Sequence, residues 1–154
     1  MSTALHRRLG PAEIEKFSSH YLNEGRKQES WRIDAVEVED GRLRAAVSMR
    51  STYVSRTDDK GFHLTIFSTL EFLSQLMIVY AHVKAGLAEK TLEGWMVESE
   101  TRSVRAIRSP DRIDVDMEVL SMRKRGHNLY GVCRYKVTDE QGGLFEVKLK
   151  GFLA

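Results

Sequence analysis

The segment from Gly61 to Gly86, GFHLTIFSTLEFLSQLMIVYAHVKAG, constrains the fold of this chain more than any other. It is apolar almost all the way round a helical projection, and a helix of that kind must be buried rather than lie on a surface. The same segment carries a carboxylate and an amide one turn apart, Glu71 and Gln75. Because an ionisable side chain is seldom buried unless it is paired or functional, the sequence predicts a site near the N-terminal end of a buried helix.

The composition indicates one soluble globular domain. The chain has 154 residues, of which 42% are hydrophobic and 30% are charged, and this length is enough to bury a sizeable core. A net charge of +2 does not by itself indicate nucleic-acid binding. The single cysteine, Cys133, lies inside a strand pattern, so we expect a buried, inert thiol in a reducing compartment.

The N-terminal residues MSTALHRRLG are polar and basic, unlike a signal peptide, and we therefore expect a cytoplasmic protein. The longest apolar stretch, Ile66 to Val83, is interrupted by serine, threonine, glutamate and glutamine, which argues against a membrane span. No cysteine and histidine spacing predicts a metal site, and no glycine-rich phosphate loop is present. We expect no cofactor and no nucleic-acid partner.

Pattern periods predict the order of elements. A first helix is expected from Pro11 to Arg26, because proline favours the first helical position. Alternating residues then predict a hairpin with its turn at Glu39 to Gly41, where the Asp-Gly signal stands. A polar loop over 51–62 and the apolar helix follow. Period-two patterns predict the remaining strands, over 95–109, 113–119, 129–137 and 145–149, with a charged turn from Arg123 to Asn128.

Antiparallel strands with one apolar helix between the first pair and the rest predict a sheet that curls around that helix. The expected class is α+β, and the description resembles the hot-dog fold: a curved antiparallel sheet wrapped around a long buried central helix. We expect residues 1–154 to form a single domain, with an N-terminal helical segment over 1–30 and the central helix over 63–86. The resemblance implies at least a homodimer formed by joining sheets edge to edge, which covers exposed strand edges.

The spacing His63-x7-Glu71-x3-Gln75 resembles hot-dog enzymes that act on acyl thioesters. In 3-hydroxyacyl-ACP dehydratases a histidine precedes the central helix, and the helix carries a Glu-x-x-x-Gln element similar to Glu71-Phe72-Leu73-Ser74-Gln75. Those dehydratases place the histidine further from the glutamate, with prolines between them, and this chain has no proline there.

A closer resemblance is to the long-chain fatty acyl-CoA thioesterase (FcoT-like) family, over roughly residues 51–152. That family has a Tyr-x-x-x-Thr run, a His-x-Asn entering the central helix, a glutamine within it and a Gly-Trp opening the next strand. The corresponding segments here are Tyr53-Val-Ser-Arg-Thr57, His63-Leu64-Thr65, Gln75 and Gly94-Trp95. The loop between Tyr53 and His63 is longer than in the family, and Thr65 replaces the asparagine.

These patterns give a set of expected site residues. The expected catalytic residues are His63, Glu71, Tyr53 and Thr65, and the expected substrate-binding residues are Arg56, Thr57, Phe67 and Gln75. His63 or Glu71 would act as the base, and backbone N–H groups of Thr65, Ile66 and Phe67 would stabilise an oxyanion at the positive end of the helix. Four of these residues also have a structural interpretation. His63 could be a capping or core residue, and Glu71 a paired carboxylate. Tyr53 could be an aromatic ring at the edge of the core, and Gln75 an amide bonded to a neighbouring loop.

The resulting expectation is a hydrolase of acyl-CoA or acyl-ACP. The alternatives are a hot-dog lyase or dehydratase acting on a 3-hydroxyacyl- or enoyl-ACP, including amine addition to an enoyl thioester, and a non-catalytic acyl-binding module. A set of basic residues is expected either to attract CoA phosphates or an acidic carrier protein, or simply to be solvated. These residues are Arg105, Arg108, Arg123, Lys124 and Arg125.

Overall fold

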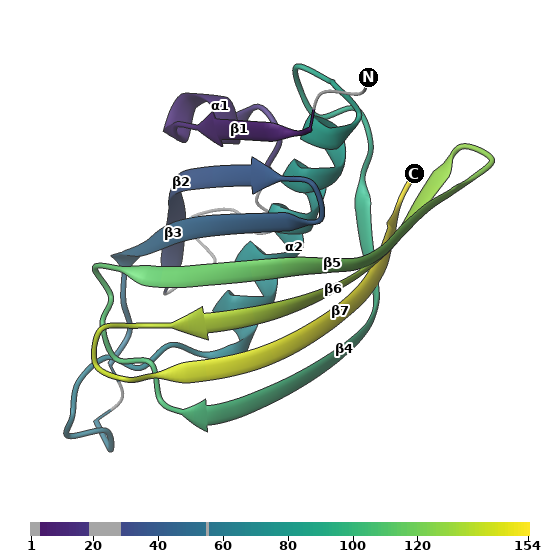
Figure 1. The fold of residues 1–154 in the computed structure, drawn as a ribbon. Helices are drawn as coiled ribbons and strands as arrows, with labels where there is room; N and C mark the ends of the chain where they lie inside the picture. The colour runs from purple at the N-terminus through teal and green to yellow at the C-terminus, as the bar shows by residue number, and fades with distance from the viewer. Residues whose placement is uncertain (1–3, 19–28, 55) are drawn as a thin grey trace.

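A computed structural model describes residues 4–18, 29–54 and 56–154. Its elements are β1 (His6–Leu9), α1 (Pro11–Glu15), β2 (Ser30–Glu39), β3 (Arg42–Ser51), α2 (Ile66–Lys84), β4 (Gly94–Arg105), β5 (Ile113–Arg125), β6 (Asn128–Thr138) and β7 (Leu144–Leu153). The strands form one antiparallel sheet in the order β1-β2-β3-β5-β6-β7-β4. The sheet curves around α2, as predicted (Figure 1).

The hairpins follow their sequence signals. β2 and β3 are joined by the predicted Asp40-Gly41 turn, and Gly41 has a φ of 77°, a conformation that favours glycine. On β5, Ile113, Val115 and Met117 are buried while the residues between them are partly exposed. The predicted one-face-buried strand is therefore confirmed at this position.

Several predicted boundaries were wrong. The N-terminal helix begins at Pro11 but gives way to a turn after Glu15, and the last part of its expected length, 19–26, lies outside the described residues. Strand β1, which precedes it, was not predicted. The expected turn at 123–128 shrinks to Gly126 and His127, because both flanking strands run further. The strand expected to reach residue 109 ends at Arg105.

Helix α2 forms the core of the protein. Thr65 caps it, since its Oγ1 accepts a hydrogen bond of 3.2 Å from the Ser68 N–H. Near its other end the buried His82 bonds the Ile78 carbonyl through Nδ1, and its Nε2 accepts from the N–H groups of Thr91 and Leu92. The helix has the length and hydropathy of a membrane span, but 72% of an 18-residue stretch of it is buried inside the protein. Its apolar surface is therefore accounted for by the sheet.

One stripe of α2 is nevertheless open, contrary to the expectation of burial on every face. Phe67 is 85% exposed, and Leu70, Glu71 and Ser74 are only partly buried. These positions recur at helical spacing on one side of the first two turns. The sheet covers the rest of the helix but leaves this stripe facing outward.

Strand β4 is an edge of the sheet and pairs only with β7 among the described strands. Almost all its residues are exposed, including the large apolar side chains of Trp95, Met96, Val97 and Val104. An edge with unpaired backbone groups and apolar side chains is a template for pairing with another chain. The opposite edge, β1, is short.

Cys133 is fully buried on the inner face of β6, as predicted. Burial raises the pKa of its thiol to about 12. The side chain therefore behaves as a small apolar group of the core.

Candidate functional site

The open stripe of α2 forms one wall of an apolar cleft with a volume of about 300 Å³. The start of β4 and the end of β7 form the other wall. The lining residues are Leu70, Glu71, Ser74, Met77, Ile78, Gly94, Trp95, Met96, Leu149 and Lys150. A mostly apolar concavity with a few polar groups is the usual form of a small-molecule site.

Glu71 is the acidic group of this cleft. Its Oε1 accepts a hydrogen bond of 3.1 Å from the indole Nε1–H of Trp31, a buried residue of β2. The Trp31 ring is fixed in turn by an edge-on contact with Phe72, with ring centroids 6.1 Å apart. One carboxylate oxygen is therefore held by a rigid donor while the side chain still lines the cleft.

A second polar cluster lies in the loop before α2. The His63 Nδ1 is 2.6 Å from the Asp58 Oδ2, and Arg108 donates from Nη1 to both carboxylate oxygens at 3.2 Å. The pKa of Asp58 is lowered, first by the His63 hydrogen bond and further by the Lys60 N–H and by Arg108. Asp58 thus stays ionised and orients the His63 ring, whose side chain is 47% exposed.

The loop is attached to the sheet through the segment that carries Arg108. The Leu64 N–H donates to the Ile107 carbonyl at 2.8 Å. Asp139, in the β6–β7 turn, accepts from the backbone N–H groups of Arg108 and Ser109 on Oδ2, and from those of Gln141 and Gly143 on Oδ1. Burial alone raises the pKa of Asp139, but these four donors together hold it below the ordinary value. One carboxylate therefore fixes two turns.

The first turn of α2 separates the two polar groups. The N–H of Ser68 is satisfied by Thr65 Oγ1, and that of Thr69 by the Thr65 carbonyl. The N–H groups of Ile66 and Phe67 donate to no acceptor within the described ranges. They stand at the positive end of the helix dipole and are the groups there that can bind an anionic oxygen.

The expected site residues do not all come together. His63 and Thr65 lie at the start of α2, whereas Glu71 lies in the cleft, about 7.5 Å further along the axis. Tyr53 is 54% exposed, and Arg56 and Thr57 are also exposed in the loop. The remaining two expected residues, Phe67 and Gln75, differ from each other in burial.

Phe67 projects from the open stripe, whereas Gln75 is completely buried and is not among the cleft residues. The i,i+4 relation predicted that Gln75 would share a stripe with Glu71. The difference arises because the cleft follows the boundary of the covered surface, so a small rotation about the axis moves a side chain from cleft to core.

The sequence did not indicate Trp31 or Ser74 as site residues. It placed Asp58 in the polar loop without a role, and it predicted Arg108 only as one of the basic residues that attract CoA phosphates or a carrier protein. Trp31 is 40 positions from Glu71, and Arg108 is 50 from Asp58, so no local spacing could have found either contact. Asp58 and His63 are only five residues apart, and that spacing was the available signal.

One group of side chains has metal-ligand geometry in the described part of the chain: His6, Glu37 and Glu39, on β1 and β2. His6 and Arg8 already bond the Glu37 carboxylate, at 3.3 and 3.4 Å. The arginine neutralises the charge that a cation would need, so these residues do not fit a resident metal.

Comparisons with known proteins give likeness in structure alone. No family model and no curated protein matches the sequence. The dehydratase heterocomplex ApeI:P from Xenorhabdus doucetiae is similar with a TM-score of 0.63 and 15% identity, over 92% of this chain and 91% of that chain. A hypothetical thioesterase with coenzyme A from Streptococcus pneumoniae gives a TM-score of 0.51 at 14% identity, over 81% and 86%. A hot-dog-like protein from Thermanaerovibrio acidaminovorans gives 0.52 at 17%, over 73% and 80%.

At such identities these likenesses establish the fold and nothing finer. The chain has the hot-dog fold, and the expectation from the sequence is confirmed. The neighbours include both thioesterases and a dehydratase, the two enzyme groups that the sequence resembles. The narrower FcoT-like resemblance remains a prediction.

Proposed function

We propose that this protein is an acyl-thioester hydrolase that acts in the cytoplasm on acyl-CoA or acyl-ACP, with Glu71 as its general base. The observation that carries the proposal is the Glu71 carboxylate, held by Trp31 in a cleft otherwise lined mainly by apolar side chains. Glu71 accepts a hydrogen bond from the buried Trp31 and also lines the wall of the cleft, where a substrate can reach it.

The stripe along α2 suits an extended acyl thioester. Apolar side chains lie on both sides of Glu71: Phe67 and Leu70 towards the helix start, and Met77 and Ile78 away from it. Helical side chains lean towards the N-terminus, so the carboxylate projects back towards the first turn. A thioester carbonyl between Glu71 and that turn meets both the base and the N–H groups of Ile66 and Phe67.

In this arrangement Glu71 removes a proton from a water molecule as the water oxygen attacks the thioester carbon. The carbonyl oxygen becomes an oxyanion, which the helix N–H groups stabilise. The C–S bond then breaks, and the thiolate takes the proton back from Glu71. The products are a carboxylic acid and a free thiol, and no cofactor is required.

The exposed β4 edge supports a homodimer in which two sheets join edge to edge. Pairing there would bring a second copy beside the open stripe of α2 and narrow the cleft. The whole chain would then act as one hot-dog domain per subunit. Tyr53, Arg56 and Thr57, exposed in the loop before α2, are proposed to contact the carrier portion of the substrate.

A dehydratase is the second candidate. One support is the likeness to the ApeI:P dehydratase heterocomplex, in which the match covers more than nine tenths of both chains. A second support is the Asp58–His63 pair, because an oriented imidazole of this kind is used in proton transfer. A 3-hydroxyacyl thioester would lose water across its α and β carbons, with one group removing the α proton and another protonating the leaving hydroxyl.

The experiment measures turnover of Glu71→Gln and His63→Gln on octanoyl-CoA and on 3-hydroxyoctanoyl-CoA. Glu71→Gln keeps shape and hydrogen bonding but removes the base, so hydrolysis should fall by about 10²- to 10⁴-fold without loss of melting temperature. Glu93→Gln, which changes an exposed carboxylate just before β4, is the matched control and should keep parental activity.

Four outcomes separate the candidate functions. Loss of octanoyl-CoA hydrolysis in Glu71→Gln alone supports the hydrolase. Elimination of water from the 3-hydroxyacyl substrate, lost in either variant, supports the dehydratase instead. A stable Glu71→Gln protein with full activity would remove Glu71 from the mechanism, and binding without any turnover would indicate an acyl-binding module.

A further inference from the structure

The β5–β6 hairpin carries the densest run of positive charge in the described residues. Arg123, Lys124, Arg125 and His127 are all exposed within five positions, and none forms an ion pair with a described acid. Many other arginines of the sheet are paired, for example Arg42 with Asp116. The charge of the hairpin is therefore available to a partner.

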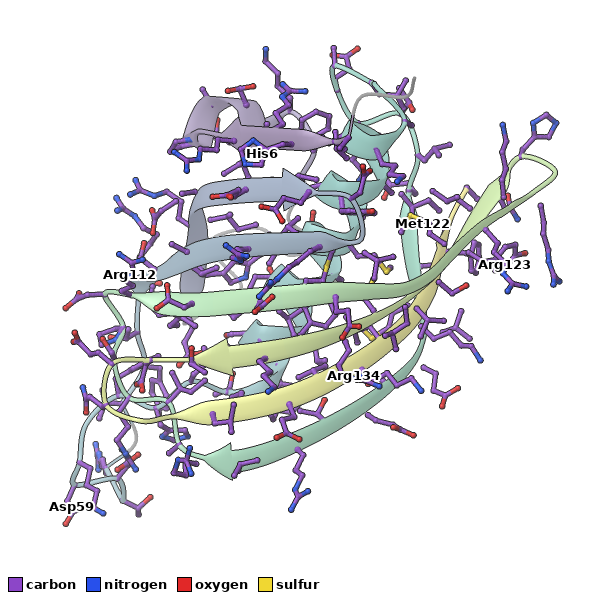
Figure 2. The ribbon with its side chains drawn as sticks, viewed as in Figure 1. His6, Asp59, Arg112, Met122, Arg123 and Arg134 are labelled. Carbon is purple, nitrogen blue, oxygen red and sulfur yellow. The ribbon has the colours of Figure 1, made fainter. Side chains whose placement is uncertain are left out.

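The hairpin also projects from the body of the protein. Gly126 and His127 form its two-residue turn, and Lys124 lies level with Leu129 and Leu153, the last strand position of β7. The tip thus extends past the rest of the sheet (Figure 1). Figure 2 shows Arg123 on this hairpin and Asp59, of the loop before α2, at the opposite end of the molecule.

An aromatic row runs from the hairpin across the outer face of the sheet to β4. Arg123 pairs with Tyr130, Tyr130 with Phe152, and Phe152 with Trp95, across four neighbouring strands. The ring centroids are 5.6 Å apart for Tyr130 and Phe152, and 6.4 Å for Phe152 and Trp95. Tyr130 and Trp95 are 42% and 57% exposed.

The row lies on the face of the sheet turned away from α2, since Gly131 and Gly151, the neighbours of Tyr130 and Phe152, face Met77 of the helix, and it ends at the start of β4. It spans three interstrand spacings, about 14 Å. A ligand docked on the hairpin therefore meets a continuous apolar surface that extends to β4.

We propose that the hairpin and the aromatic row are the docking surface for an acidic acyl carrier protein. This proposal rests on the proposed function and names the carrier that delivers the thioester. Complementary charge steers such an encounter and fixes its orientation. The exposed rings supply the apolar centre that protein interfaces favour.

The shape of the surface favours a protein over CoA. Small ligands occupy concave sites that bury most of their surface, whereas this basic feature is a projecting finger. Its charges and rings together cover more length than the phosphates of one nucleotide can contact. An acidic protein face can contact both the tip and the row.

The test compares hydrolysis of one acyl group, octanoyl, on an acyl carrier protein and on CoA. The variant Arg123→Glu/Lys124→Glu/Arg125→Glu reverses the charge of the hairpin tip. The matched control, Arg50→Glu/Lys136→Glu/Lys148→Glu, makes the same change in formal charge at exposed positions away from the tip. Fluorescence anisotropy measures binding of labelled holo-carrier to each protein, and melting temperatures confirm that both variants are folded.

The tip variant should lose about 10-fold or more in kcat/KM on the carrier substrate, with little change on octanoyl-CoA, and should bind the holo-carrier correspondingly more weakly. The control should change neither. Equal loss on both substrates would identify a CoA phosphate site instead, and no loss on either would also overturn the proposal. Tighter binding of a labelled single-stranded RNA than of the carrier, abolished in the tip variant, would overturn it as well.

The hydrolysis and anisotropy measurements distinguish failure of the proposed function from failure of the docking proposal. If the parental protein hydrolyses neither substrate, the hydrolase is wrong, and the anisotropy data alone decide the docking surface. Tip-dependent binding of the holo-carrier then supports it, and binding that the tip variant leaves unchanged refutes it.

Discussion

Asp139 holds two turns with a single carboxylate, and its removal should be among the most damaging single changes outside the apolar core. In Asp139→Ala, four backbone N–H groups lose their acceptor. Those of Arg108 and Gln141 can reach water, because both residues are partly or fully exposed. Those of Ser109 and Gly143 are buried and remain unsatisfied.

A buried donor without a partner costs about 1–3 kcal/mol, so the two together should lower the free energy of unfolding by about 3 kcal/mol. For a chain of this length that corresponds to a fall of roughly 6–12 °C in Tm. The measurement is thermal unfolding followed by circular dichroism. Asp139→Asn keeps one acceptor oxygen and should lose less, and Glu140→Ala, at the exposed neighbouring position, should lose almost nothing.

The effect should depend on pH in a defined direction. The pKa of Asp139 is lower in the folded protein than in the unfolded chain. The folded state therefore gains stability above the unfolded value, about 3.9, and loses it as the pH falls through the folded value. The difference between parental protein and Asp139→Ala should be largest near neutral pH and shrink below about pH 4. An alanine variant that melts within 1 °C of the parent at pH 7 would refute this reasoning.

Two further predictions concern the cleft and the sheet edge. Trp31→Phe removes the donor to Glu71 but keeps a ring against Phe72, so turnover should fall about 10-fold while the melting temperature changes little. Unchanged turnover would show that Trp31 does not position Glu71. Val97→Lys, on the exposed β4 edge, should convert the proposed dimer to a monomer in multi-angle light scattering, whereas Leu120→Lys, also at an exposed apolar residue but on an interior strand, should not. A dimer that survives Val97→Lys places the interface elsewhere.

The elements with strong local signals were predictable. Helix α2 was visible because its apolar run is long, and the β2–β3 hairpin because alternation surrounds an Asp-Gly turn. Strand β1 was missed because only Leu9 of its four residues is buried and its pairing with β2 is non-local. Four mostly basic residues carry no period from which a strand could be recognised.

The candidate site was predictable only in part, for the same physical reason. Glu71 stood out as a charge in an apolar helix, and its place in a cleft agrees with that observation. Trp31 orients Glu71, and Asp58, held by Arg108, orients His63. The Trp31–Glu71 and Arg108–Asp58 contacts join residues far apart in the sequence, which only the folded sheet brings together. Periodicity showed that the helix is buried, but not which stripe the sheet leaves uncovered.

The chemistry of Cys133 makes the proposals practical to examine. A thiol with a pKa of about 12, enclosed in the core, is almost entirely protonated at neutral pH and inaccessible to alkylating reagents. It is also the sole cysteine of the chain. A cysteine introduced at an exposed position such as Lys124 can therefore be labelled selectively with a maleimide dye or a nitroxide in the otherwise native sequence. Distances and mobilities at the hairpin then become measurable without a cysteine-free background, which would open a cavity beneath the sheet.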